Sequence, residues 1–189
     1  MAIDAEKIEQ PKSPEKTQEV PADWKANILA FACHYCAFAA ADLAGVMRLS
    51  YPSNVKVVRL PCTGKLDQIY ILRAFERGVD GVFAAGWLEG QCHFLEGNLN
   101  AVKRVRKVKK KLYMLGINPE RVEFYNLSAA QGPRWAEICT EFTNKIKAMG
   151  PSPIWFALHK NKESGEIEKQ TAWRKKLVEL PFTDEGVEK

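Results

Sequence analysis

The stretch Ile28–Gly45, ILAFACHYCAFAAADLAG, changes its pattern in the middle. It begins with a short apolar run, which is typical of a strand that is buried in a sheet. From Tyr35 onward it is rich in alanine and has helical spacing, which favours a helix. Cys33 and Cys36 lie where one pattern gives way to the other. We therefore expect the first thiol at the end of a strand and the second at the start of the following helix.

Further along the chain, the alternation of strand and helix continues. Short apolar or β-branched runs predict the other strands, and amphipathic segments, most of which end at glycine, predict the other helices. The expected strands span 27–33, 55–62, 81–87 and 121–128, and the expected helices span 35–49, 65–78, 97–116 and 132–150. Four strand–helix units in succession predict an α/β fold with a doubly wound, flavodoxin-like sheet of about four mostly parallel strands.

Apolar spacing within these helices predicts their buried faces. The helix at 65–78 is expected to bury Ile69, Leu72 and Phe75 on one side. The two longer helices have longer apolar stripes. The stripe of the third helix consists of Leu99, Val102, Val105, Val108, Leu112 and Leu115, and that of the fourth consists of Trp135, Ile138, Cys139, Phe142, Ile146 and Met149.

The length and composition indicate one globular domain with tails. The chain has 189 residues, of which 46% are hydrophobic and 27% charged, and this is enough to build one core. We expect a flexible or partner-docking tail at 1–24, the α/β domain at 25–153 and a C-terminal docking extension at 154–189. No apolar run approaches the ~18 residues of a membrane helix, and the N-terminus does not resemble a secretory signal. We therefore expect a cytoplasmic protein with reduced thiols.

Four of the five cysteines are expected at one edge of this sheet. In an open parallel sheet, ligands bind outside the carboxyl ends of the strands. Cys33 and Cys62 end the first two expected strands, Cys92 lies in the loop after the third, and Cys36 is about one turn beyond Cys33. Cys139 lies instead in the apolar stripe of the last helix, where we expect it to pack as a small apolar residue.

The four edge cysteines are compatible with three kinds of chemistry. Zinc would take four thiolates in a closed tetrahedral site, which would make the domain a zinc-stabilised binding module. An iron–sulfur cluster would take the same four. A thiol–disulfide oxidoreductase would need only Cys33 and Cys36. His34 and His93 adjoin these cysteines and could replace a thiolate, donate hydrogen bonds or face solvent. Gly86, Gly90 and Gly97 crowd the third loop, where glycine lets the backbone approach a buried group.

Residues 103–111, KRVRKVKKK, contain seven of the 28 lysines and arginines, and the chain has a net charge of +5. A basic segment of this kind raises nucleic acid as a partner. However, aromatic residues do not interleave with these bases, and no groove-reading motif accompanies them. We therefore expect a solvated helix face or a docking site for an acidic protein surface, and no nucleic acid.

Five segments, in this order, resemble the delta subunit family of methyl-viologen-reducing (F420-non-reducing) hydrogenase. The segments are CHYCAFAAADLAG (33–45), RLPCTGKLD (59–67), AFERGVDGVFAAGW (74–87), GQCHFLEGN (90–98) and GPRWAEI (132–138). The resemblance extends over about residues 27–153. It implies an iron–sulfur protein on an α/β domain, which agrees with the fold expected from the strand and helix patterns.

The resemblance implies a [2Fe-2S] cluster, with Cys33, Cys36, Cys62 and Cys92 as its ligands. It implies an electron-transfer subunit that makes no bonds in a substrate. Such a protein relays single electrons between a hydrogenase or dehydrogenase and a heterodisulfide-reductase-A-like flavoprotein. Formate dehydrogenase and aromatic-ring reductase subunits of anaerobes are further implied partners. The chain departs from the family at Trp87, where members often have cysteine.

Overall fold

The computed structural model describes residues 20–22 and 24–163 of the chain. Four strands form one sheet: β1 (Ile28–Cys33), β2 (Val55–Leu60), β3 (Gly81–Gly86) and β4 (Val122–Asn126). Their order is β2-β1-β3-β4, and every neighbouring pair is parallel. The prediction of a doubly wound, flavodoxin-like sheet is therefore confirmed.

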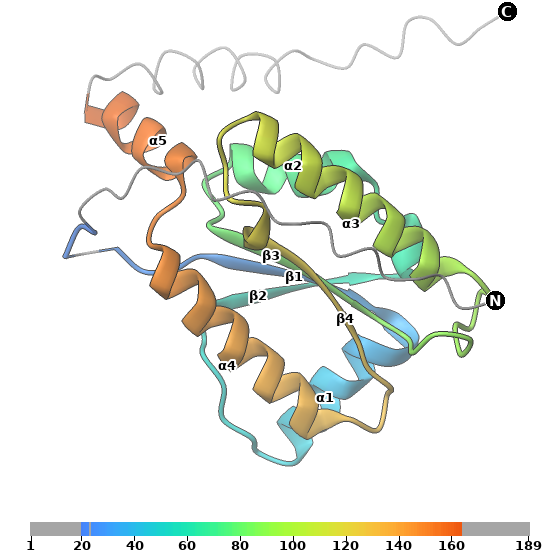
Figure 1. The fold of residues 1–189 in the computed structure, drawn as a ribbon. Helices are drawn as coiled ribbons and strands as arrows, with labels where there is room; N and C mark the ends of the chain where they lie inside the picture. The colour runs from blue at the N-terminus through green and yellow to red at the C-terminus, as the bar shows by residue number, and fades with distance from the viewer. Residues whose placement is uncertain (1–19, 23, 164–189) are drawn as a thin grey trace, which may run out of the picture.

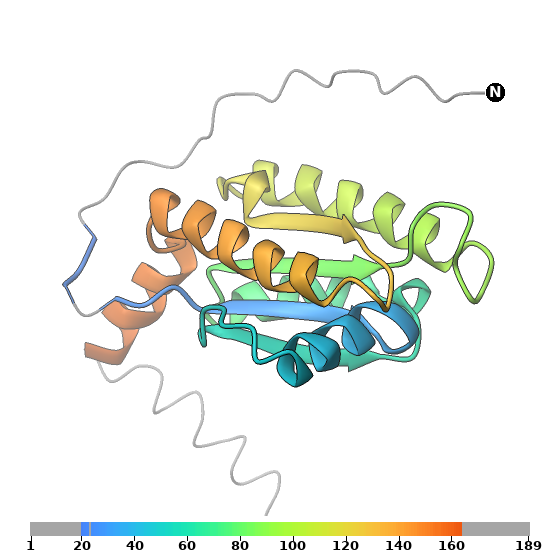
Figure 2. The same ribbon diagram turned by 90° about the horizontal axis from the view of Figure 1, so that it is seen from below.

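Helices cover both faces of the sheet (Figure 1). They are α1 (Ala39–Val46), α2 (Gln68–Glu76), α3 (Gly97–Met114), α4 (Gly132–Met149) and α5 (Pro153–Glu163). Figure 1 shows α2 and α3 on one face and α1 and α4 on the other. Figure 2 gives the view from the side of α1 and α4. Within the described residues, no helix is long and apolar enough to cross a membrane.

The two central strands are buried on both faces, as the apolar runs predicted. In β1 and β3, alternate residues point to opposite faces of the sheet, so each strand contributes to two cores. On one face, Ala30, Ala32 and Phe83 pack with Trp135 and Phe142 of α4. The other core, between the sheet and the α2–α3 layer, contains Phe31, Val82, Ala84, Ile71, Phe75, Val105, Val108 and Leu112.

Two of the predicted helix faces were wrong at their ends. Ile69 of α2 is 46% exposed, and Leu99 and Leu115 are exposed at the two ends of α3. The predicted stripe of α2 advances in steps of three residues, and that of α3 begins with three such steps, each of which rotates by about 60° around a helix of 3.6 residues per turn. Several steps therefore carry the stripe out of the core. The stripe of α4 alternates steps of four and three from Trp135 through Cys139 and Phe142 to Ile146, with Ile138 beside it, and these residues are buried as predicted.

A buried polar clamp closes the amino edge of the sheet. The Asp80 carboxylate accepts hydrogen bonds from Trp24 Nε1 (3.2 Å), Asn27 N (3.0 Å) and Ser152 N (2.9 Å). The fully buried Arg121 guanidinium donates to the carbonyl oxygens of Asp80 (3.2 Å), Gly150 (2.9 Å) and Pro151 (3.1 Å). These bonds join the segment before β1, the start of β3, the end of α4 and the start of α5.

The predicted tails lie largely outside the described residues. Of the predicted extension at 154–189, the structure describes the residues of α5 up to Glu163, and of the predicted tail at 1–24 it describes 20–22 and Trp24. Trp24 packs against the core of the α1–α4 face and bonds to Asp80. The division of the chain into tail, domain and docking extension stays a prediction.

We expect Arg121→Met to lower the free energy of unfolding by about 3 kcal/mol, because it leaves buried carbonyl groups without donors. Arg106→Met, at an exposed position of α3, should change it by less than about 0.5 kcal/mol. Urea unfolding followed by circular dichroism measures both values. Equal stability of the two variants would show that the clamp contributes nothing.

Candidate functional site

The structure places the four predicted site cysteines at the carboxyl edge of the sheet. Cys33 is the last residue of β1, and Cys36 lies in the π-helical turn η1 (His34–Phe38) that follows it. Cys62 is the N-cap of η2 (Thr63–Lys65) after β2, and Cys92 lies in the loop between β3 and α3. Figure 1 shows η1 and the β3–α3 loop at the same end of the sheet. None of the four is more than 8% exposed.

The four thiols form two neighbouring pairs. The side chains of Cys33 and Cys36 share a hydrogen bond, and so do those of Cys62 and Cys92. The pairs also interact with each other, because Cys36 experiences the charge of Cys92 and Cys62 that of Cys33. All are free thiols. Among the residues that the structure describes, no three His, Cys, Asp or Glu side chains converge on a site for a single metal ion.

Hydrogen bonds, burial and mutual charge give three of these thiols different pKa values. A hydrogen bond from Cys36, followed by backbone N–H donors of Tyr35, Thr63 and Cys36, lowers the pKa of Cys33 to about 6. The same thiol–thiol bond raises the pKa of Cys36, and burial raises that of Cys62. The thiols of Cys36 and Cys62, whose pKa values are raised, keep their protons until a cation binds and displaces them, whereas Cys33 loses its proton more readily. The donor set therefore suits a thiophilic metal.

Backbone groups approach the sulfur atoms closely. Gly64 N donates to Cys62 Sγ at 3.3 Å. A Cβ atom added at Gly97 would lie 2.4 Å from Cys62 Sγ and 3.2 Å from Cys92 Sγ. The close approach expected of the loop glycines therefore occurs at Gly97. Gly90 borders open space and has a positive φ of 74°, and Gly86 faces Thr63 and Phe124 instead of the thiols.

Three residues that support the site were missed from the sequence. Arg104 Nη1 donates to the carbonyl oxygens of Gly64 and Leu66 (3.1 Å to the latter) and so braces the loop after Cys62. Buried Asn98 Nδ2 donates to the carbonyl oxygens of Trp87 (3.1 Å) and Leu88 (2.9 Å) and holds the loop before Cys92. Arg104 gave no signal because it is one of seven bases within nine residues. Gly64, two residues after Cys62, was a recognisable signal that was overlooked.

An aromatic patch covers this edge on the outside. The rings of Tyr35 and His93 stack with centroids 4.3 Å apart. Phe94 and His34 lie against Tyr35 edge-on, with centroids 5.8 and 5.0 Å away. Leu95 extends the patch and is 84% exposed. Both histidines are thus exposed ring partners beside the cysteines.

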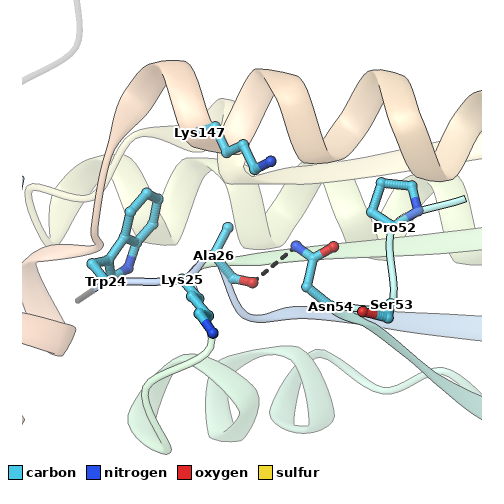
Figure 3. Close-up of a pocket in the computed structure, with 7 residues that line it drawn as sticks. All are labelled: Trp24, Lys25, Ala26, Pro52, Ser53, Asn54 and Lys147. Carbon is cyan, nitrogen blue, oxygen red and sulfur yellow. Dashed lines mark hydrogen bonds between the residues drawn. The ribbon is translucent and has the colours of Figure 1, made fainter. Parts of the chain in front are cut away.

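A shallow pocket lies at the opposite edge of the sheet (Figure 3). It is lined by residues that precede β1 and β2, among them Trp24, Lys25 and Asn54, and by Lys147 of α4. Asn54 Nδ2 donates to the Ala26 carbonyl oxygen across its floor (2.9 Å). The pocket is therefore separated from the four thiols by the length of the strands.

Gly97→Ala should destabilise the metal-free protein by about 1–3 kcal/mol, because the added methyl group overlaps Cys62 Sγ. It should also raise the reactivity of Cys62 toward a thiol reagent, since the sulfur has to move. Gly45→Ala is the matched control: nothing lies within 4 Å of an added Cβ in α1, so helix propensity should stabilise the protein by about 0.5–1 kcal/mol. Thermal unfolding and thiol titration test the pair, and a tolerated Gly97→Ala would contradict the close packing.

The chain matches the FlpD family, described as methyl-viologen-reducing hydrogenase, delta subunit, over residues 28–150. It is 44% identical over 129 residues to the D-type iron-sulfur subunit of the F420-non-reducing hydrogenase of Archaeoglobus profundus, covering 68% of this chain and 94% of that protein. It is 45% identical over 127 residues to the corresponding vhu iron-sulfur subunit of Methanococcus maripaludis, covering 67% and 95%.

A third relative is a larger protein. The chain is 36% identical over 124 residues to the A-type subunit of the ferredoxin:CoB-CoM heterodisulfide reductase of Methanosarcina mazei, covering 66% of this chain and 16% of that protein. The family match includes all four strands and the residues from Cys33 to Cys92. The fold, the cysteine-bearing segments and these relatives agree, and the chain belongs to the family of methyl-viologen-reducing hydrogenase delta subunits.

Proposed function

We propose that this chain is an electron-transfer subunit that holds a [2Fe-2S] cluster on Cys33, Cys36, Cys62 and Cys92. The observation that carries the proposal is the arrangement of four buried thiols in two adjacent pairs. In a [2Fe-2S] cluster each iron takes two protein ligands, so two pairs of thiolates suit its two ends. Relatives named iron-sulfur subunits support the same assignment.

In this proposal the protein tunes the cofactor and makes no bonds in a substrate. The cluster, when bound, accepts and returns one electron at a time. The N–H groups of Gly64 and Thr63 point at cysteine sulfurs and stabilise negative charge there. Burial of the thiols works in the opposite direction, because it disfavours the more negative reduced state. The balance of these two effects sets the reduction potential.

The proposed electron partners follow from the relatives. One segment of the heterodisulfide reductase relative is similar to this chain, so a domain of this kind occurs within that longer polypeptide. We infer that a flavoprotein of the heterodisulfide-reductase-A type is one partner. A hydrogenase, formate dehydrogenase or aromatic-ring reductase subunit is the proposed other partner, within a cytoplasmic redox complex.

The aromatic patch is the proposed contact surface for one of these partners. Tyr35, Phe94 and Leu95 expose apolar surface directly outside the thiol pairs, where a second redox centre has the shortest path to the cluster. Leu95 lies within the same short turn as Cys92, since its N–H donates to the Cys92 carbonyl oxygen (2.9 Å). A partner that covers this surface would also exclude water from the cluster.

A thiol–disulfide exchange enzyme is the second candidate, favoured by the pKa of about 6 for Cys33. Low-pKa thiols paired with a second cysteine are typical of such enzymes. However, Cys33 and Cys36 are 2% and 0% exposed, which bars a protein disulfide from reaching them. This candidate also leaves Cys62 and Cys92 without a role. A zinc-stabilised binding module would use the same four thiols and is distinguished by its metal.

Anaerobically purified protein should contain about two irons and two sulfides per chain and give a spin-half EPR signal after reduction. Serine at any of the four site cysteines should remove more than half of the iron, because a ligand is lost. Cys139→Ser is the matched control: this thiol is buried within α4, and its variant should keep its iron. One zinc and no iron would establish the zinc module. Exchange activity that survives Cys62→Ser in a metal-free protein would establish the dithiol enzyme.

Leu95→Asp should slow electron transfer to a heterodisulfide-reductase-A-type partner by about tenfold or more, because a charge is placed in an apolar contact. Val46→Asp is the control, since Val46 is 74% exposed at the far end of α1. Iron content should be unchanged in both variants. Stopped-flow reduction of the partner's flavin measures the rates. Equal rates for Leu95→Asp and wild type would place the contact elsewhere.

A further inference from the structure

The indole N–H of Trp87 is buried and has no hydrogen-bond acceptor among the described residues. Trp87 directly follows the last residue of β3, Gly86, at the carboxyl edge of the sheet. Trp87 is partly buried and packs against the core of the α1–α4 face, whose members include Cys33, Cys36 and Trp135. A buried donor without an acceptor destabilises a protein by about 1–3 kcal/mol. Such a donor beside a site therefore points to an acceptor that binds there.

The backbone of Trp87 is fixed beside the thiols. Its carbonyl oxygen accepts hydrogen bonds from Asn98 Nδ2 at 3.1 Å and from Asn126 Nδ2. Asn98 adjoins Gly97, which packs against the sulfur atoms of Cys62 and Cys92. On the neighbouring strand, Ala32 of β1 pairs with Ala85 of β3. Cys33 is the residue after Ala32, and Trp87 is the second residue after Ala85. The backbone of Trp87 therefore lies at the edge where Cys33 ends β1, and Asn98 joins it to the start of α3, which packs against Cys62 and Cys92.

Only three buried side-chain polar atoms in the described residues lack a partner: Gln68 Oε1, Trp87 Nε1 and Trp135 Nε1. Trp135 is fully buried in the core of the α1–α4 face, with its ring centroid 5.8 Å from that of Phe83 in the middle of β3. The other members of its cluster are alanine, valine, leucine, isoleucine, phenylalanine and cysteine side chains. Of the two indole donors, Trp87 is the one that directly follows a strand at the carboxyl edge, and Trp135 of α4 provides a control of the same chemistry.

We propose that the indole N–H of Trp87 donates a hydrogen bond to a sulfur atom of the cluster held by the four cysteines. This inference rests on the proposed function. Cluster sulfurs carry negative charge, and an N–H group directed at them stabilises the reduced state more than the oxidised state. Trp87 is thus a residue that raises the reduction potential of the cluster. It acts together with the N–H groups of Gly64 and Thr63.

Labelling of the wild-type protein tests the contact without any substitution. Protein with ¹⁵N in its indole rings is reduced and examined by pulsed EPR in H₂O and in D₂O. We expect a weak ¹⁵N coupling and an exchangeable-proton coupling to the cluster spin. The same signals should be lost in Trp87→Phe and kept in Trp135→Phe. A reduced cluster without a ¹⁵N coupling would overturn the proposal, even where a variant fails to fold.

Replacement of the Trp87 indole by benzothiophene removes the N–H group and keeps the size and shape of the ring. The midpoint potential should shift to a more negative value while the iron content stays constant. The same replacement at Trp135 should leave the potential unchanged. An unchanged potential after replacement at Trp87 would overturn the proposal while the electron-transfer function stands. Wild-type protein that binds no iron would instead overturn both, and metal analysis separates the two cases.

Discussion

Parallel pairing of β1 with both β2 and β3 is the constraint on which the site depends. In a parallel sheet all strands end at the same edge, so residues that follow different strands meet there. Cys33 and Cys92 are 59 positions apart in the chain, yet both lie at this edge. The apolar sequences of β1 and β3 keep these strands in the centre of the sheet. The position of the thiols is therefore a consequence of strand order, which is set by the burial of residues distant from the site.

The cost of gathering thiols is electrostatic. The hydrogen bond with Cys33, followed by burial and mutual charge, raises the pKa of Cys36, and burial followed by mutual charge raises that of Cys62, whereas hydrogen bonds lower the pKa of Cys33. Backbone N–H groups offset part of this cost, and they can do so because Gly64 and Gly97 let the chain approach the sulfur atoms. Arg104 holds the Gly64 loop in place through its carbonyl groups. A thiophilic cation would offset the repulsion between thiolates, which is consistent with the cluster proposed for these four cysteines.

The two edges of the sheet have different roles. The amino edge is closed by the Asp80 and Arg121 clamp, which ties the segment before β1 to α4 and α5. The carboxyl edge carries the thiols and an exposed aromatic patch around Tyr35 and Leu95. Satisfied polar groups stabilise the first edge, while the second keeps apolar surface and, among the described residues, an indole N–H without an acceptor. This division leaves the carboxyl edge available to the proposed cluster and partner without loss of the core.

The amino-acid sequence by itself determined the order of strands and helices along the chain, the parallel sheet and the edge at which the cysteines lie, because apolar periodicity and strand ends are local patterns. It misplaced Ile69 and Leu99, since repeated three-residue steps rotate around a helix. Only the tertiary structure decided how the thiols pair and which bases are structural. Arg104 and Arg121 have no local signature, because their acceptors are carbonyl groups that lie close only after folding. Likewise, only the folded structure shows that the indole N–H of Trp87 is buried without an acceptor among the described residues.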